Sequence, residues 1–190
     1  YKMVMFHHPP HSLGENIESA YTNPVPVIER NPEGAITAIR YEYPKQDDYI
    51  IRDVLPLLEQ AGVQFVFYGH SHLWNRFISP TGMHFLESSN VGNSYGAYVG
   101  KLKRKVPTTY QENYAATGNP NGLAPAMPTI APLTEPDGTP LPYIASNEIT
   151  AFSIFDTASG SVSSYRFDTH QPDSPVVKFD EFWLQPLPSQ

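Results

Sequence analysis

The chain has 190 residues, of which 40% are hydrophobic and 16% charged, and its formal net charge is −7. This balance is typical of a folded protein with a core and excludes a largely disordered chain. The acidic charge argues against a general binder of nucleic acid or anionic membranes, because those ligands select basic surfaces.

The chain contains no cysteine, which excludes disulfides, zinc–thiolate sites and cysteine nucleophiles. Any metal must therefore be held by histidine, carboxylate, amide or water. No apolar run approaches the roughly 20 residues of a membrane-spanning helix, so no membrane span is expected. The absence of cysteine, together with abundant Tyr, Asn, Thr and Pro, favours export to an extracellular or periplasmic location. The chain enters an apolar segment directly at Tyr1, and we expect a further segment upstream.

The first third of the chain predicts the order strand, loop, helix, strand. Residues 2–6 (KMVMF) predict a short buried strand, and a polar, proline-bearing loop follows as far as Lys45. Residues 63–68 (VQFVFY) predict a second buried strand. In a layered α/β fold, both strands then lead into loops at the same edge of the sheet.

A helix is predicted over 49–60, where apolar side chains recur at helical spacing. Asp47 or Asp48 can cap its start, and Gly62 suits its end. Pro56 lies inside this pattern and should kink the helix or shift its start.

Two hairpins are predicted farther along, one around the turn SPTG at 79–82 and one around TASGS at 157–161. A proline-rich excursion over the surface separates them. The predicted parts of the chain are a core at 1–92, a proline- and glycine-rich insertion at 93–147, a hairpin at 148–168 that completes the sheet, and a tail at 169–190.

Five of the seven histidines fall in two clusters, each directly after a predicted strand: His7, His8 and His11, then His70 and His72. Imidazole is a common ligand of transition metals. Positions two apart in an extended loop point the same way, so the second cluster could converge on one ion. The alternative is that such a pair is structural or solvated, which is the usual case for an isolated His-x-His.

Three segments resemble the calcineurin-like metallophosphoesterases, including the purple acid phosphatase branch: VMFHHPP at 4–10, DVLPLLEQAGVQ at 53–64 and VFYGHSH at 66–72. The resemblance covers about residues 1–92. It implies an α/β fold, namely the carboxy-terminal half of a four-layer α/β/β/α sandwich with mixed sheets and a long proline-rich insertion.

The resemblance also implies a function. Members of this family hydrolyse phosphate esters with two metal ions that share a bridging hydroxide. By position, His7 and His70 would bind the second metal and His72 the first, with Gly69 close to the phosphate. The implied cofactors are two ions of Fe, Mn or Zn, with Ca as an alternative.

Other residues near these motifs have both a functional and a structural interpretation. His8 and His11 could donate hydrogen bonds to the ester as catalytic residues, although a structural role is favoured for both. Arg76 could bind the phosphate or form a salt bridge. Asn90 could face the substrate or belong to a turn.

The family's D-x-H, GD and GNH-D/E blocks are not found in this sequence. The resemblance therefore implies a partner: the amino-terminal half of the fold, on an upstream segment or a separate chain. Two alternatives stay open, a non-catalytic structural or surface-assembly protein that retains the fold, and a mononuclear zinc hydrolase with three histidine ligands.

Overall fold

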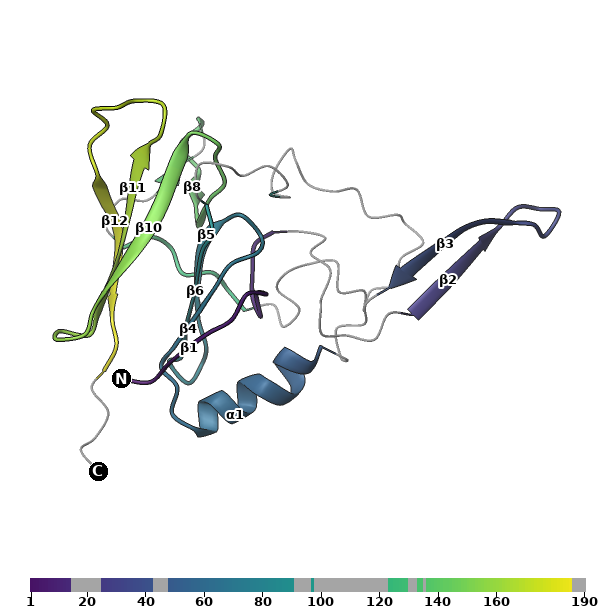
Figure 1. Cartoon of the computed structure of the whole chain (residues 1–190), viewed down its shortest axis with the longest axis horizontal. Coiled ribbons are helices and arrows are strands. Elements are labelled where there is room, and N and C mark those ends of the chain that lie inside the picture. The colour runs from purple at the N-terminus through teal and green to yellow at the C-terminus, as the bar shows by residue number, and fades with distance from the viewer. Residues whose placement is uncertain are drawn as a thin grey trace.

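The computed structural model is a mixed α/β fold, built mostly of strands in several sheets with one short helix (Figure 1). It describes residues 1–14, 25–42, 48–90, 97, 123–129, 133–134 and 136–185. Most of the predicted insertion at 93–147, including the greater part of its glycine-rich beginning, lies outside the described residues.

The central sheet has five strands in the order β1-β4-β6-β5-β9. Their bounds are β1 Met3–Met5, β4 Phe65–Tyr68, β6 His84–Ser88, β5 Trp74–Ile78 and β9 Tyr143–Ile144. β1, β4 and β6 run parallel, whereas β5 is antiparallel to both of its neighbours. The expectation that the first two predicted strands end at the same edge is therefore confirmed.

A second sheet packs against one face of the central sheet. It contains β10 (Ile149–Asp156), β11 (Ser161–Asp168) and β12 (Val177–Trp183), all antiparallel. Side chains of both sheets form the core between them: Phe65, Trp74 and Leu86 from one, Val162, Phe179 and Phe182 from the other. The predicted hairpin is confirmed, and β12 brings part of the predicted tail into the same sheet.

The helical segment begins with a π-helical turn, η2 (Ile50–Val54), and continues as the α-helix α1 (Leu55–Gln60). Pro56 explains the change, because proline has no N–H and its ring crowds the carbonyl four residues earlier, which favours a wider turn before it. Asp48 Oδ1 accepts hydrogen bonds from two N–H groups at the start, Ile50 at 3.0 Å and Ile51 at 3.2 Å. Gly62, with φ of 70°, follows the end of the helix, as predicted.

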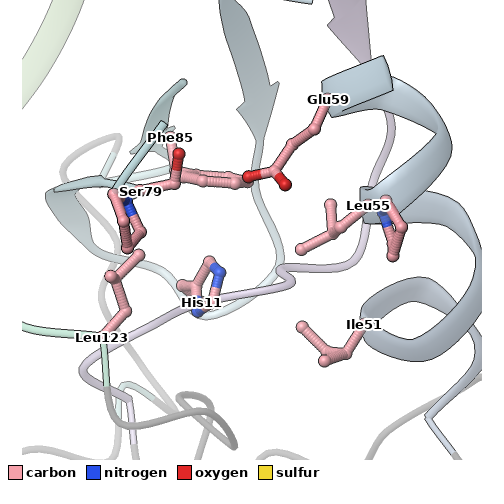
Figure 2. Close-up of a pocket in the computed structure, with 9 residues that line it drawn as sticks. His11, Ile51, Leu55, Glu59, Ser79, Phe85 and Leu123 are labelled. Carbon is pink, nitrogen blue, oxygen red and sulfur yellow. The ribbon is translucent and has the colours of Figure 1, made fainter. Parts of the chain in front are cut away.

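This helical segment covers the other face of the central sheet. Leu55 packs with Val66, Phe77 and Phe85, which alternate along their strands with the residues that face the second sheet. The layers are therefore helix, sheet and sheet. Between helix and central sheet lies a pocket of about 340 Å³, which His11 and Phe85 help to line (Figure 2).

The region read from the sequence as a polar loop contains a β-ribbon instead. β2 (Val25–Arg30) and β3 (Ile36–Glu42) pair antiparallel and project from the layers (Figure 1). Gly34, with φ of 83°, lies in the turn between them. A second small pair, β7 (Leu133–Thr134) and β8 (Pro140–Leu141), lies within the described part of the predicted insertion.

The first strand differs from its prediction in burial. Within β1, Met3 and Met5 are exposed and Val4 is half-buried. β1 is the edge strand of the central sheet beside β4, so one side of each of these methionines faces solvent. An apolar sequence alone does not distinguish an edge strand from a central one.

Candidate metal site

The candidate site lies at the carboxyl edge of the three parallel strands β1, β4 and β6. His7 follows β1 and His70 follows β4. Since β6 lies between β4 and β5 in the sheet, the loop at 69–73 that joins those two strands must pass over the end of β6. This topology brings both histidine loops above Glu87, near the end of β6.

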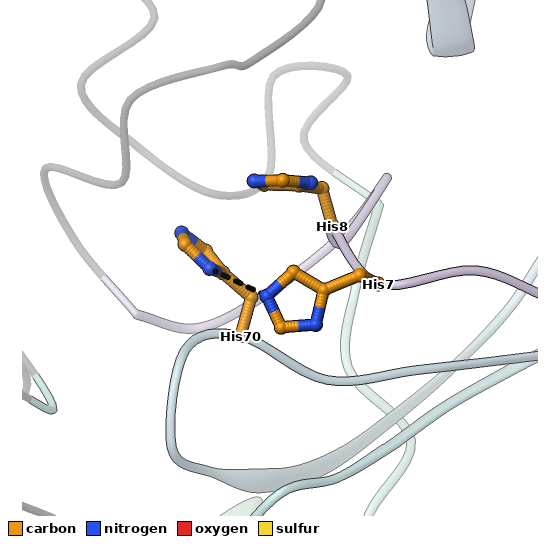
Figure 3. A group of neighbouring side chains, drawn as sticks. All are labelled: His7, His8 and His70. Carbon is orange, nitrogen blue, oxygen red and sulfur yellow. Dashed lines mark hydrogen bonds between the residues drawn. The ribbon is translucent and has the colours of Figure 1, made fainter.

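Three imidazoles meet in this region: His7, His8 and His70 (Figure 3). One ring nitrogen from each lies within 4.8 Å of the others. His7 Nε2 and His70 Nδ1 are 3.2 Å apart and share a hydrogen bond. The predicted meeting of His7 and His70, separated by 63 positions, is thus present in the structure.

The backbone of the second loop is strained at two of its residues. His70 has φ of 83° and His72 has φ of 60°, in the left-handed region that non-glycine residues seldom adopt. Gly69 N donates a hydrogen bond to His7 O at 3.0 Å, which ties the start of this loop to the first one. Such conformations persist only where the surroundings enforce them, and they concentrate at functional sites.

Glu87 supplies much of that enforcement. Its fully buried carboxylate accepts hydrogen bonds from the first loop through Ser12 Oγ at 3.0 Å and from the second loop through Ser71 N at 2.8 Å and the Ser71 hydroxyl. Asn75 Nδ2 and Ser89 Oγ each donate another at 2.9 Å. One side chain therefore links both histidine loops. It also binds Ser71, which lies between the two strained histidines.

The surroundings of His8 and His70 disfavour the protonated form of both rings. Burial, and next the proximity of His7, lowers the pKa of His8 below its ordinary value. Burial also lowers the pKa of His70, followed by the effects of His8, His7 and His72. A neutral ring has a lone pair available to a metal ion, and both shifts favour that form.

The two other predicted histidines lie apart from this group. His72, predicted as a metal ligand, is exposed and lies outside the set of three ligand nitrogens. His11, predicted as a possible catalytic residue, is only 3% exposed. Its ring packs against Phe85 and Phe77, with centroids 4.7 and 5.7 Å away.

The residues predicted to contact substrate have structural partners. The buried Arg76 donates to both carboxylate oxygens of Asp180, from Nε at 2.7 Å and from Nη2 at 3.0 Å. Asn90 is fully buried and donates from Nδ2 to Ile149 O at 2.6 Å. The salt-bridge alternative for Arg76 is thus observed, and Asn90 links the end of β6 to β10. Gly69 alone of the three adjoins the histidine group.

Comparison with known proteins gives a plain result. No family model and no curated protein matches this chain. The described residues also contain no helix that is both long and apolar enough to cross a bilayer.

Two features of the site were missed in the sequence. Glu87 was overlooked although a signal was present: it alternates with Phe85 and Met83 on one face of an apolar strand, where a carboxylate is out of place. The place of His8 in the group of three histidines was also not predicted, because β1 ends at Met5 and strand alternation does not extend to His8. The possible catalytic role of His8 stays a prediction.

Proposed function

We propose that this chain supplies histidine ligands to a metal centre that hydrolyses phosphate esters, as its resemblance to the calcineurin-like metallophosphoesterases implies. The observation that supports the proposal is the meeting of His7 and His70 at one edge of the sheet, on two loops held by Glu87. Open α/β sheets characteristically carry their sites at this edge.

The donor set suits a transition metal. Imidazole nitrogen is a good ligand for zinc and iron, whereas calcium takes oxygen ligands, so the described histidines support Fe, Mn or Zn over Ca. Two nitrogen ligands of a tetrahedral zinc ion lie about 3.3 Å apart at the usual bond length, and His7 Nε2 and His70 Nδ1 lie 3.2 Å apart. His72 remains the proposed ligand of the other metal.

A bound pair of ions would supply a hydroxide nucleophile and polarise the phosphoryl oxygen. The three grouped side chains are imidazoles, which carry no negative charge, so a two-metal centre needs carboxylates from elsewhere to balance its charge. We propose that the amino-terminal half of the same fold supplies them, as an upstream segment or a separate chain. In this proposal that half also adds the outer helical layer of a four-layer sandwich, and the complete protein is exported.

Two observations favour other functions. The group of His7, His8 and His70 matches the three histidine ligands of a mononuclear zinc hydrolase. The same group contains no carboxylate among the described residues, which favours a structural or surface-assembly protein that retains the fold without catalysis.

Metal titration tests whether the grouped histidines bind a metal ion, which these proposals have in common. We expect the 190-residue chain to bind Zn²⁺ or Mn²⁺ in calorimetry, and His70→Ala to weaken binding at least about tenfold. His170→Ala is the matched control, because His170 is an exposed imidazole in the turn after β11. Equal affinity of His70→Ala and the unchanged chain would contradict the site.

Activity then separates the alternatives. Hydrolysis of 4-nitrophenyl phosphate by the complete protein, with two ions bound and loss of activity in His7→Ala and His70→Ala, supports the binuclear enzyme. One ion per molecule with hydrolysis indicates the mononuclear enzyme. Metal binding without hydrolysis of mono- or diesters indicates the structural protein.

A further inference from the structure

The pocket between the helical segment and the central sheet is separate from the histidine group. Its volume is about 340 Å³, and none of His7, His8 and His70 is among the residues that line it. That volume is within the range of small-molecule sites. At roughly 30 Å³ for each water-sized group, it accommodates a molecule of about ten non-hydrogen atoms.

The walls of the pocket are mostly apolar. Ile51 and Leu55 come from the helical segment, Phe85 from β6, and Leu123 from a segment that packs beside β5. Such walls favour an aromatic or aliphatic body, because burying its surface removes it from water.

Two side chains with ionisable groups border this apolar space from opposite sides (Figure 2). His11 comes from the first loop and is only 3% exposed. The Glu59 carboxylate comes from α1 and is exposed at the rim. Thr81 Oγ1 donates to Glu59 Oε1 at 2.8 Å and lies 2.7 Å from Ser79 Oγ, which holds the carboxylate in place.

We propose that this pocket binds a small primary amine with an aromatic body, its ammonium group on Glu59 and its ring between Leu55, Phe85 and Leu123. The charge favours a cation: Glu59 is an acid, no Lys or Arg is among the described residues that line the pocket, and the chain carries a net charge of −7. The buried His11 ring lines the pocket on the side opposite Glu59. The site is independent of the proposed metal centre.

The test uses 2-phenylethylamine as the probe and the 190-residue chain as the protein. We expect amide and methyl resonances around the pocket to shift in NMR titration with a Kd of about 1 mM or tighter, as nine non-hydrogen atoms allow. The neutral isostere 2-phenylethanol should bind at least about threefold more weakly, because it lacks the charge that Glu59 attracts.

Two variants locate the site. Glu59→Gln should weaken amine binding at least about threefold and remove the preference for the amine over the alcohol. Ile51→Trp should abolish binding by filling the space from a half-buried helix position. The matched control is Asp53→Asn on the neighbouring turn, whose carboxylate pairs with Arg52 at 2.7 Å and does not line the pocket; its affinity should be unchanged.

Three results would overturn the proposal: no resonance shifts up to about 10 mM probe, equal binding of amine and alcohol, or unchanged amine affinity in Glu59→Gln. Glu59 is on the surface, so its substitution leaves the fold intact and remains decisive even if Ile51→Trp does not fold. Stronger binding of the anion 3-phenylpropanoate than of the amine would also reject it.

Discussion

Each face of the central sheet buries an acidic side chain, but the two faces provide different hydrogen-bond partners for it. Asn75 and Arg76 are neighbours on β5 and point to opposite faces. Asn75 reaches Glu87 below the histidine loops, and Arg76 reaches Asp180 of the second sheet. One face thus carries a complete ion pair, and the other an acid with neutral hydrogen-bond donors.

The difference shows two uses of buried charge. The Arg76–Asp180 pair joins two sheets. Thr129, in a described part of the predicted insertion, donates to Asp180 Oδ1 from its N–H and from its hydroxyl, each at 2.9 Å. The charges of the ion pair cancel, and its geometry is bidentate, which suits a permanent structural link. Glu87 instead spreads its hydrogen bonds over loops that do not otherwise pair. A carboxylate with several neutral donors can hold irregular backbone in place where a sheet ladder cannot.

Breaking the ion pair should have the largest effect. Asp180→Leu leaves the Arg76 guanidinium buried without its counter-ion, and we expect the free energy of unfolding to fall by about 3–5 kcal/mol in urea denaturation. Arg76→Met should lower the free energy of unfolding by a similar amount, because it leaves the buried Asp180 carboxylate without its counter-ion.

The double variant Arg76→Met/Asp180→Leu should recover much of this loss, because both charges are then gone. Lys178→Met is the matched control on the same strand. It removes a partly exposed pair with Glu181, whose atoms are 2.9 Å apart, and should change the stability by less than about 1 kcal/mol. A double variant as unstable as the worse single one would mean that shape, not charge, dominates this face.

Substitution of Glu87 should affect both the stability of the protein and the candidate site. Glu87→Gln places an amide donor among existing donors, and we expect a loss of about 2–3 kcal/mol in the free energy of unfolding. If Glu87 positions the histidine loops, Zn²⁺ affinity should also fall by about 10- to 100-fold in calorimetry. Glu33→Gln, in the exposed turn of the ribbon, should change neither. Undiminished zinc binding in folded Glu87→Gln would show that the loops hold themselves.

The dependence of stability on pH should be a smaller effect than the two substitutions above, and it should have opposite signs on the two faces. Burial, and next the charge of Arg76, lowers the pKa of His84 to about 4. Between about pH 6.5 and pH 4, His84 is protonated in the unfolded chain but not in the folded protein. The free energy of unfolding should therefore fall as the pH drops through this range. Because the ring is partly exposed, the loss should be on the order of 2 kcal/mol.

His84→Phe tests this prediction. The His84 ring stacks on Phe182 with centroids 4.3 Å apart, and its buried Nδ1 has no hydrogen-bond partner among the described residues, so phenylalanine keeps the packing and removes the titration. Urea denaturation at pH 7 and pH 5 should then show a smaller difference than in the unchanged chain. A difference as large as before would assign the pH dependence to other groups.

Glu87 contributes with the other sign, since burial raises its pKa. The folded protein retains this proton above the pH at which the unfolded chain releases it. Stability from this group is therefore present at low pH and decreases as pH rises through the folded pKa.

The elements with strong local patterns were predictable from the sequence. The buried run before GHSH became β4, and both predicted hairpins formed around turns with a glycine of positive φ, Gly82 and Gly160. The ribbon β2–β3 was missed because its strands mix proline, charge and exposed aliphatics and show no alternation against a core. Its turn sequence, NPEG at 31–34, was the available signal.

The site was predictable only in part. That His7 and His70 meet follows from two parallel strands ending at one edge. The inclusion of His8 depends on backbone geometry after β1 that no periodicity encodes. The role of Glu87 depends on the sheet order β4-β6-β5, a non-local property, and the partner of Arg76 lies 104 positions away.

Among the described elements, the main contacts of β2 and β3 are with each other, and about half of the surface of Ile28 and of Ile39 is exposed. The amide protons of the β2–β3 ribbon can therefore exchange with solvent through local opening that leaves the layers closed. A segment that opens by itself can also be lengthened, shortened or exchanged without loss of core stability, which makes this ribbon the natural place for the chain to acquire or lose a recognition element.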